Sequence, residues 1–328
     1  MLAFIISRLL QALPVILVVG FISFAMFAFL GDPVTMMLGQ QYTQAERLAL
    51  IHHLGLDQPF VVQYAKFMWA VLHGEFGVSY RLAQPVAALI AERLPATLEL
   101  AAVAALFSLF IGVPLGVYTG IYRSSPASRL VMVVSLIGVS LPTFLTGILL
   151  ILVFSVLLGW LPSFGRGQVV HFGFWTTGLL TVSGLKALIL PAITLGLFQM
   201  TLIMRLVRAE MMEVLRSDYV KFARARGLSR RAINFGHALK NTLVPVITIA
   251  GLQFGGIIAF SIVTETVFQW PGVGLLLVQS IQVGDIPVMS AYLLLVAVIF
   301  ILINLAVDLL YFAVDPRLRL ERSGAAAR

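Results

Sequence analysis

Long apolar stretches alternate with short polar segments along most of the chain. Six stretches contain no Asp, Glu, Lys or Arg, and each reaches the length of about 17–25 residues that a helix needs to cross a bilayer. They are Leu9–Gly31, Leu100–Tyr122, Leu130–Gly165, Ala187–Met204, Asn241–Thr264 and Ile286–Val307. The third exceeds one span, and Trp160 and Pro162 in its tail indicate that its helix ends near Leu158. The pattern predicts an all-α integral membrane protein with six transmembrane helices.

The distribution of Lys and Arg decides the topology. Residues 167–185 also lack formal charge, but a seventh span there would move the basic segment 205–240 to the outside, against the positive-inside rule. With six spans and a cytoplasmic N-terminus, 16 of the 22 Lys and Arg lie inside: Arg8, Arg123 and Arg129, nine in 205–240 and four in the tail. We therefore interpret 159–186 as an external loop, with a partly re-entrant path left open, and expect both termini in the cytoplasm.

Composition excludes several other classes. The chain is 60% hydrophobic and 11% charged with a mean hydropathy of +1.02, whereas soluble domains are roughly 45–50% apolar and about 25% charged. The net charge of +8 therefore reflects basic cytoplasmic segments and not nucleic-acid binding. Cysteine is absent and the five histidines are scattered, so we expect no disulfide and no metal site.

The polar segment 32–95 is expected outside the membrane and helical. Thr43 and Glu46 have the spacing of a capping box, and Asp57 can cap a second helix that has Pro59 in its first turn. Two interpretations stay open: a small helical cap packed on the outer mouth, and a docking surface for an external partner.

The segment 205–240 carries the strongest local signal. It holds nine Lys and Arg against three acidic residues. Asp218 is placed to cap a short helix, Gly227 allows a left-handed exit from it, and Ser229 can begin a second helix.

One face of that short helix is expected to serve a partner. Tyr219, Phe222 and Ala223 share a face at helical spacing. The loop either lies on anionic lipid as a basic amphipathic segment or presents the helix to a groove on another protein, for which aromatic residues and Arg are suited.

The apolar spans contain few chemical groups. Pro142 lies in the middle of the third span and indicates a fixed kink or a hinge. Gly112, Gly116 and Gly120 repeat every fourth residue, which favours close helix packing, within the chain in preference to a subunit interface. The candidates for a translocation path are Ser140, Pro142, Gln199, Gln253 and Ser261.

Several ordered motifs resemble the permeases of ABC importers, in particular the first permease of the peptide/nickel branch. The segment 218–228 resembles that branch's version of the EAA loop, although Lys221-Phe222-Ala223 stands where Glu-Ala-Ala is usual. The other matching segments are 55–59, 74–79, 85–86, 92–100, 265–274, 285–288 and 311–319. Together they span nearly the whole chain.

The resemblance implies a type I importer permease that works with a homologous second permease, two cytoplasmic ATPase subunits and an external binding protein in a bacterial inner membrane. It implies small peptides as solutes, with nickel, glutathione or another small solute as the alternative. No G-x-x-x-x-G-K-[ST] motif is present, so ATP and Mg²⁺ are expected on the ATPases, with no catalytic residue and no cofactor here. A stand-alone channel or ion-gradient transporter, or a membrane-embedded enzyme, is the competing class.

The resemblance also implies the residues that couple this chain to the ATPases. They are Asp218, Tyr219, Phe222, Ala223, Arg224, Ala225, Gly227 and Leu228. Gly227→Asp, or Ala223→Asp with Arg224→Glu, is then expected to leave a folded protein that cannot transport. The implied organisation is a first span with its external loop (1–95), a transmembrane core (96–316) and a cytoplasmic tail (317–328).

Overall fold

The structure is a computed structural model that describes residues 2–29, 34, 42–54 and 56–314; the predicted tail 317–328 lies outside the described residues. The chain forms two compact units, residues 1–97, 171–177 and 271–301 in the first, and 98–170, 178–270 and 302–328 in the second. The helices are α1 (Leu2–Phe29), α3 (Gln44–Leu54), α4 (Phe60–Leu72), α5 (Val86–Ile121), α6 (Pro126–Ser140), α7 (Thr143–Leu150), η1 (Ile151–Leu157), α8 (Val182–Val214), α9 (Asp218–Ala225), η2 (Ala232–Ala238), α10 (Leu239–Val267), α11 (Val273–Val283) and α12 (Ile286–Val314). A two-stranded hairpin, β1 (Val170–Phe172) and β2 (Trp175–Thr177), is the exception to the all-α prediction within these residues.

The predicted spans correspond to long apolar helices. Within the described residues, five helices are long and apolar enough to cross a membrane: α1, α5, α8, α10 and α12. The remaining predicted span, the third (Leu130–Gly165), is two helices, α6 and α7–η1, which meet at 110°. A simple kink at Pro142 is therefore wrong: proline lacks an N–H and disfavours helical geometry at the preceding Leu141, so α6 ends at Ser140 and a new helix begins at Thr143.

In the first unit, α4 packs along α1. The hydroxyl of Tyr64 donates to the Leu17 carbonyl oxygen at 2.8 Å, and the ring of Phe24 contacts those of Phe60 and Phe67. The capping box is confirmed, since the Glu46 carboxylate accepts from the Thr43 N–H at 2.8 Å. One prediction is corrected: Pro59, not Asp57, occupies the N-cap of α4, without a side-chain cap. The helix that contains the second predicted span, α5, begins at Val86, within the segment 32–95.

The sequence patterns missed α11, which is too short to span. Its first N–H, at Val273, is satisfied by the hydroxyl of Thr97 at 2.9 Å. After α11, the Asp285 carboxylate accepts from the Ser79 hydroxyl at 2.5 Å and from the Tyr80 N–H at 3.1 Å. Burial, together with this carboxylate, raises the pKa of Tyr80 to about 12. The contacts tie the loop before α5 to the turn before α12.

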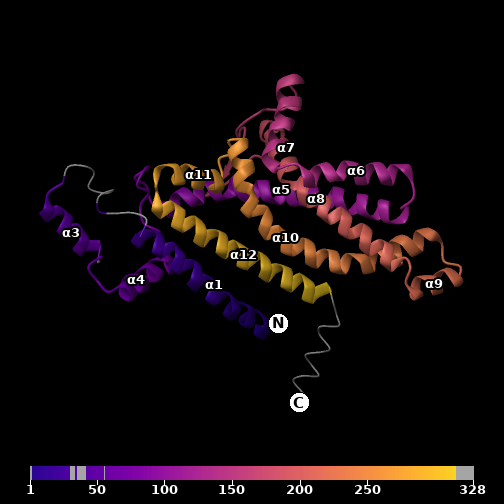
Figure 1. Cartoon of the computed structure of the whole chain (residues 1–328), viewed down its shortest axis with the longest axis horizontal. Coiled ribbons are helices and arrows are strands. Elements are labelled where there is room, and N and C mark those ends of the chain that lie inside the picture. The colour runs from indigo at the N-terminus through magenta and orange to yellow at the C-terminus, as the bar shows by residue number, and fades with distance from the viewer. Residues whose placement is uncertain (1, 30–33, 35–41, 55, 315–328) are drawn as a thin grey trace, which may run out of the picture. The chain divides into compact units, whose positions relative to one another are not determined.

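In the second unit, the glycine repeat of α5 packs directly on α8, as the preferred interpretation predicted. A Cβ at Gly116 would lie 2.6 Å from Val207 Cβ and 2.7 Å from the Met204 carbonyl oxygen. A core cluster joins α5, α8, η2 and α10 around the buried side chains of Val207 and Met211. Figure 1 shows α8 and α10 running together toward α9.

This packing predicts that Gly116→Ala destabilises the protein. Alanine gains about 1 kcal/mol of helix propensity, but the added methyl meets backbone that cannot move, and overpacking costs about 1–3 kcal/mol. Gly256→Ala in α10 is the control, because its Cβ would have no neighbour nearer than 3.9 Å. Thermal unfolding in detergent should give a lower midpoint for Gly116→Ala than for Gly256→Ala; equal midpoints would show that α5 and α8 are not in close contact.

Candidate functional site

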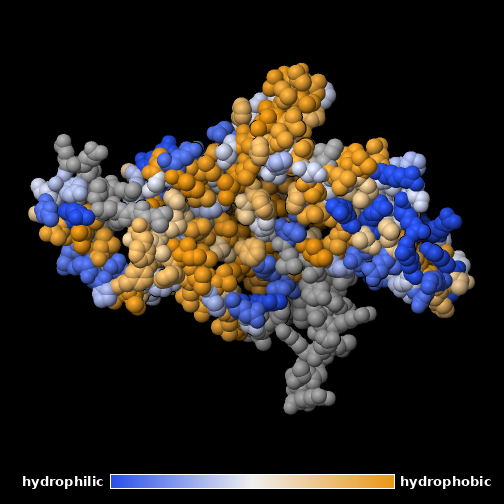
Figure 2. All heavy atoms as spheres, in the orientation of Figure 1, coloured by the Kyte–Doolittle hydropathy of each residue, from blue (hydrophilic) through white to orange (hydrophobic). Residues whose placement is uncertain are grey.

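A polar hairpin links α8 and α10, the two helices at the centre of the second unit. We call residues 215–238 the basic hairpin; it contains α9 and η2 and follows α8 directly. Hydrophilic side chains gather over it in Figure 2, in contrast to the apolar helices that lead into it. The hairpin is therefore the polar end of an otherwise apolar helix pair.

The inner face of α9 is small and apolar. Val220 is fully buried and Ala223 is 6% exposed, and both pack with the buried Ile233 of η2. Val214 and Leu215, at the end of α8, cover the same cluster. The face that binds α9 to the rest of the hairpin is therefore the one that contains Ala223.

This arrangement corrects the predicted face of α9. Tyr219 and Phe222 are exposed, whereas Ala223 points inward, because the helix turns about 100° per residue and Val220 and Ala223 are three residues apart. A charge at Ala223 would be buried, so the expected folded Ala223→Asp variant is not supported. Asp218 is also not the cap: it is the first residue of α9, and Ser217 occupies the N-cap.

The end of α9 has the predicted left-handed turn. Gly227 has φ of +78°, and the N–H groups of Leu228 and Gly227 donate to the carbonyls of Ala223 and Arg224 at 3.3 and 2.9 Å. These two bonds form a Schellman motif, which ends a helix sharply. Ser229 then accepts from the Ala232 N–H at 3.3 Å, as predicted for the start of the second helix.

The outer face of α9 is aromatic and basic. Phe222 is 65% exposed, and the guanidinium of Arg226 lies 5.9 Å from its ring centre. The Tyr219 hydroxyl accepts from the Asn241 amide at 2.7 Å, which fixes that ring against the start of α10. The hydrogen bond and charge of Lys221 lower the pKa of the Asp218 carboxyl. Arg224, Ala225 and Leu228 are exposed as well.

A cavity of about 380 Å³ lies at the break between α6 and α7. It brings together four of the five predicted path residues, Ser140, Pro142, Gln199 and Gln253, from the break, α8 and α10. Ser261 does not line it, because its buried hydroxyl donates to the Ile258 carbonyl at 2.8 Å and to Glu265 at 3.2 Å. The remaining lining residues are Val139, Leu141, Thr143, Leu195, Phe198, Gly256, Ile257 and Phe260.

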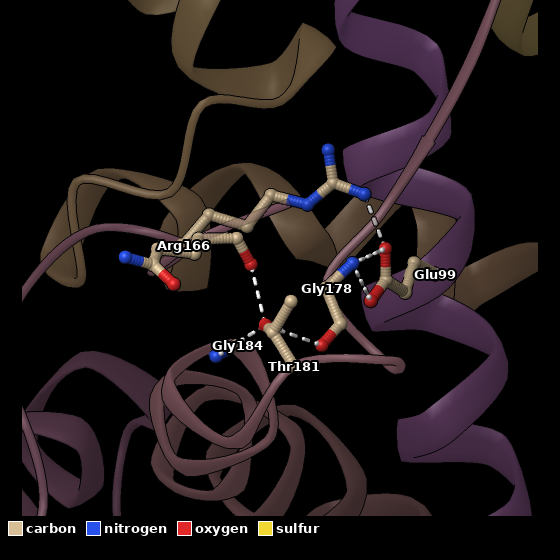
Figure 3. A network of polar contacts seen from close by, with 6 residues as sticks. Glu99, Arg166, Gly178, Thr181 and Gly184 are labelled. Carbon is tan, nitrogen blue, oxygen red and sulfur yellow. Dashed lines mark hydrogen bonds and ion pairs between the residues drawn. The ribbon is translucent and has the colours of Figure 1, made fainter. Parts of the chain in front are cut away.

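A buried ion pair holds the loop before α8. Figure 3 shows the carboxylate of Glu99, on α5, paired with Arg166 and accepting from the Gly178 N–H at 3.0 Å. Thr181 caps α8 by accepting from the Gly184 N–H at 3.0 Å. The guanidinium of Arg166 also lies 5.9 Å from the ring centre of Trp270.

Glu99 directly precedes the second predicted span, and the sequence patterns gave Arg166 no role. The available signal was that Arg166 is the one charged residue between Arg129 and Lys186. An isolated charge in such a stretch needs a partner when it is buried, and here the partner is Glu99. The pair orders a loop, and neither of its residues belongs to the basic hairpin or to the residues that line the cavity. Among the residues that the structure describes, no three His, Cys, Asp or Glu are grouped as a metal site requires.

Comparison with known proteins assigns the class. Residues 112–320 match the family model of the binding-protein-dependent transport system inner membrane component, and residues 1–101 match the N-terminal model of such membrane components. A chain of the MetNI methionine ABC transporter, in an inward-facing conformation, superposes with a TM-score of 0.56 over 69% of this chain and 96% of its own, at 21% identity. The fold is thus that of an ABC importer permease.

Relatives that align with this chain over nearly their whole length support the same class. The dipeptide transport system permease DppB of Alkalihalophilus pseudofirmus is 39% identical over 97% of this chain and 100% of its own. The di/tripeptide permease DppB of Pseudomonas aeruginosa is 40% identical (98% and 100%), and the dipeptide permease DppB of Escherichia coli K12 is 39% identical (97% and 99%).

The chain therefore belongs to the family of binding-protein-dependent transport system inner membrane components. It is a multi-pass inner-membrane permease of an ABC importer, a class that works with ATPase and substrate-binding partners.

The inward position of Ala223 generates a stability prediction. Ala223→Asp should destabilise the hairpin because a carboxylate placed among Val220 and Ile233 loses its water without gaining a partner, at a cost of a few kcal/mol. Ala225→Asp, an exposed change on the same helix, is the control and should be within about 0.5 kcal/mol of the parent. Limited proteolysis of the purified protein should cut the hairpin faster only in Ala223→Asp; identical cleavage rates would contradict the inward assignment.

Proposed function

We propose that the chain is the permease subunit through which an ATP-driven importer moves small peptides, and that the basic hairpin docks in a groove on a cytoplasmic ATPase. The observation that carries the docking role is the two-sided character of α9. Its small residues are packed against the ends of α8 and η2, while Phe222 and Arg226 stand in solvent. An aromatic ring with a neighbouring Arg, left exposed on a firmly held helix, suits insertion into a groove of a partner.

Peptides are the proposed solutes because the full-length relatives carry dipeptide and di/tripeptide names at 39–40% identity. Nickel, glutathione or another small solute on the same machinery is the alternative. The cavity supports the peptide proposal, because the described residues of its lining offer amide, hydroxyl and apolar groups and include no charged residue that would select a metal cation.

The proposed assembly has four further parts. A homologous second permease completes the translocation path, two ATPase subunits bind ATP and Mg²⁺, and an external binding protein delivers the solute. This chain supplies no catalytic group of its own. The basic hairpin and both termini then lie in the cytoplasm, which agrees with nine Lys and Arg between residues 205 and 240.

The proposed mechanism is a population shift between inward- and outward-facing arrangements. ATP binding changes the separation of the ATPases, and the hairpin passes this movement to α8 and α10, which line the cavity with Gln199 and Gln253. A ligand shifts such an equilibrium only by its difference in affinity for the two states. Coupling free energies are typically about 1–3 kcal/mol, so the loss of one good anchor is enough to disconnect ATP hydrolysis from transport.

The docking role predicts that Phe222→Ala yields a folded but uncoupled permease. Truncation of an aromatic anchor at a protein interface costs about 2 kcal/mol or more, so peptide uptake should fall roughly tenfold or further. The measurement is uptake of radiolabelled dialanine by proteoliposomes that contain the complete importer, together with ATPase stimulation by the external binding protein. Thermal unfolding should be unchanged, because the ring is 65% exposed.

Trp69→Ala is the matched control, since that ring is 67% exposed and lies on α4, outside the proposed ATPase contact. Uptake by Phe222→Ala equal to that of the control would contradict the docking role. Uptake by this chain alone, without ATPases, would instead favour a stand-alone channel or ion-gradient transporter.

A further inference from the structure

We propose that the cavity at the break between α6 and α7 is a binding subsite for the terminal carboxylate of the passing peptide, held by uncharged donors. The proposal rests on the peptide function above and assigns a chemical task to the cavity. It follows from the polar groups that line the cavity and from the lack of charged side chains among the described lining residues.

The first donor is the side-chain amide of Gln199. This residue, in the middle of α8, is 4% exposed, and its Nε2 atom has no hydrogen-bond partner among the residues that the structure describes. Buried amide groups are almost always paired, because leaving one unpaired costs the free energy of its lost hydration. Gln199 lines the cavity, so a ligand bound there can supply the acceptor that its amide lacks.

The second donor is the N-terminus of α7. The 110° break begins a new helix whose N-cap is Pro142, and no side chain caps it. The first N–H groups of a helix have no partner within the helix, and the aligned peptide dipoles leave a partial positive charge there. Pro142 and Thr143 line the cavity, so this charge lies at its wall. Broken membrane helices recurrently use this end for anionic groups of a solute.

The lack of charged side chains among the described lining residues limits the class of ligand that the cavity can bind. None of the described lining residues is Asp, Glu, Lys, Arg or His. Without a carboxylate, the peptide's amino group meets only neutral acceptors there, beside a helix end whose partial charge is also positive. Without a cation, it holds a carboxylate through neutral donors and a helix dipole, which favours a contact that also releases.

The apolar part of the wall suits side chains of any kind. Leu195, Phe198, Ile257 and Phe260 offer apolar surface without a directional polar group. Every linear peptide has a terminal carboxylate, whereas its side chains differ. A subsite that binds the carboxylate specifically and contacts the side chain only through apolar surface can accept peptides of many sequences.

The test uses the absence of cysteine from this chain. Gly256→Cys places a single thiol of this chain in the cavity wall, where an added Cβ has no neighbour nearer than 3.9 Å. In the complete importer in detergent, without the external binding protein, the rate of alkylation of this thiol by iodoacetamide is followed by mass spectrometry. Dialanine and its C-terminal amide are compared as protecting ligands.

The proposal predicts that dialanine half-protects the thiol at a concentration roughly tenfold lower than the amide does, since a hydrogen bond to a charged acceptor is stronger than one to a neutral acceptor. Gln199→Met, which removes the donor and keeps the volume, should remove most of this difference. Thr264→Val is the matched control: Thr264 Oγ1 is also buried and unpaired among the described residues but does not line the cavity, so the difference should remain.

Equal half-protection by the two ligands, or a difference that Gln199→Met leaves undiminished, overturns the carboxylate subsite. Thermal unfolding of each variant checks that the fold is retained. Failure of the peptide function has a separate signature: the parent importer would not take up dialanine into proteoliposomes, whatever the alkylation result. Uptake without any protection would leave the peptide function standing and remove the subsite.

Discussion

The packing of α8 against α10 is the contact on which the rest of the second unit depends. Small and branched side chains allow it, with Ile203, Val207 and Met211 of α8 buried in the same cluster as Val246 and Ala250 of α10. The glycines of α5 bring a third helix onto α8 at backbone distance. Because interiors of this kind are close-packed, displacement of one helix end is transmitted to the neighbouring helix and is not absorbed by voids.

The two features with a proposed function lie at different points of this helix pair. Gln199 in α8 and Gln253 in α10 line the cavity, and the basic hairpin joins the same two helices. About 15 residues of continuous helix separate Gln199 from the end of α8, roughly 22 Å. The Schellman turn at Gly227 and the cluster of Val220, Ala223 and Ile233 hold the hairpin in a fixed conformation at the ends of α8 and α10. In the proposed docking, a force on Phe222 would therefore be applied to the helices that line the cavity.

Sequence patterns predicted what depends on composition and local geometry. The apolar stretches gave the long helices, Thr43 and Glu46 gave the capping box, and Gly227 gave the left-handed turn. They did not reveal features that depend on contacts between distant segments. The inward position of Ala223 is set by Ile233, and the role of Arg166 by Glu99. Pro142 indicated a break in the third span, but the 110° angle between α6 and α7–η1 depends on tertiary packing.

The most direct test asks what Phe222 touches. With no native cysteine in the chain, Phe222→Cys can carry a maleimide–benzophenone probe at this single position, and irradiation of the complete importer then captures the neighbour. The account predicts a covalent adduct between this chain and an ATPase subunit, and labelling of the thiol only by reagents that reach the cytoplasm. An adduct with lipid alone, or labelling in intact cells by a maleimide that cannot cross the membrane, would contradict it.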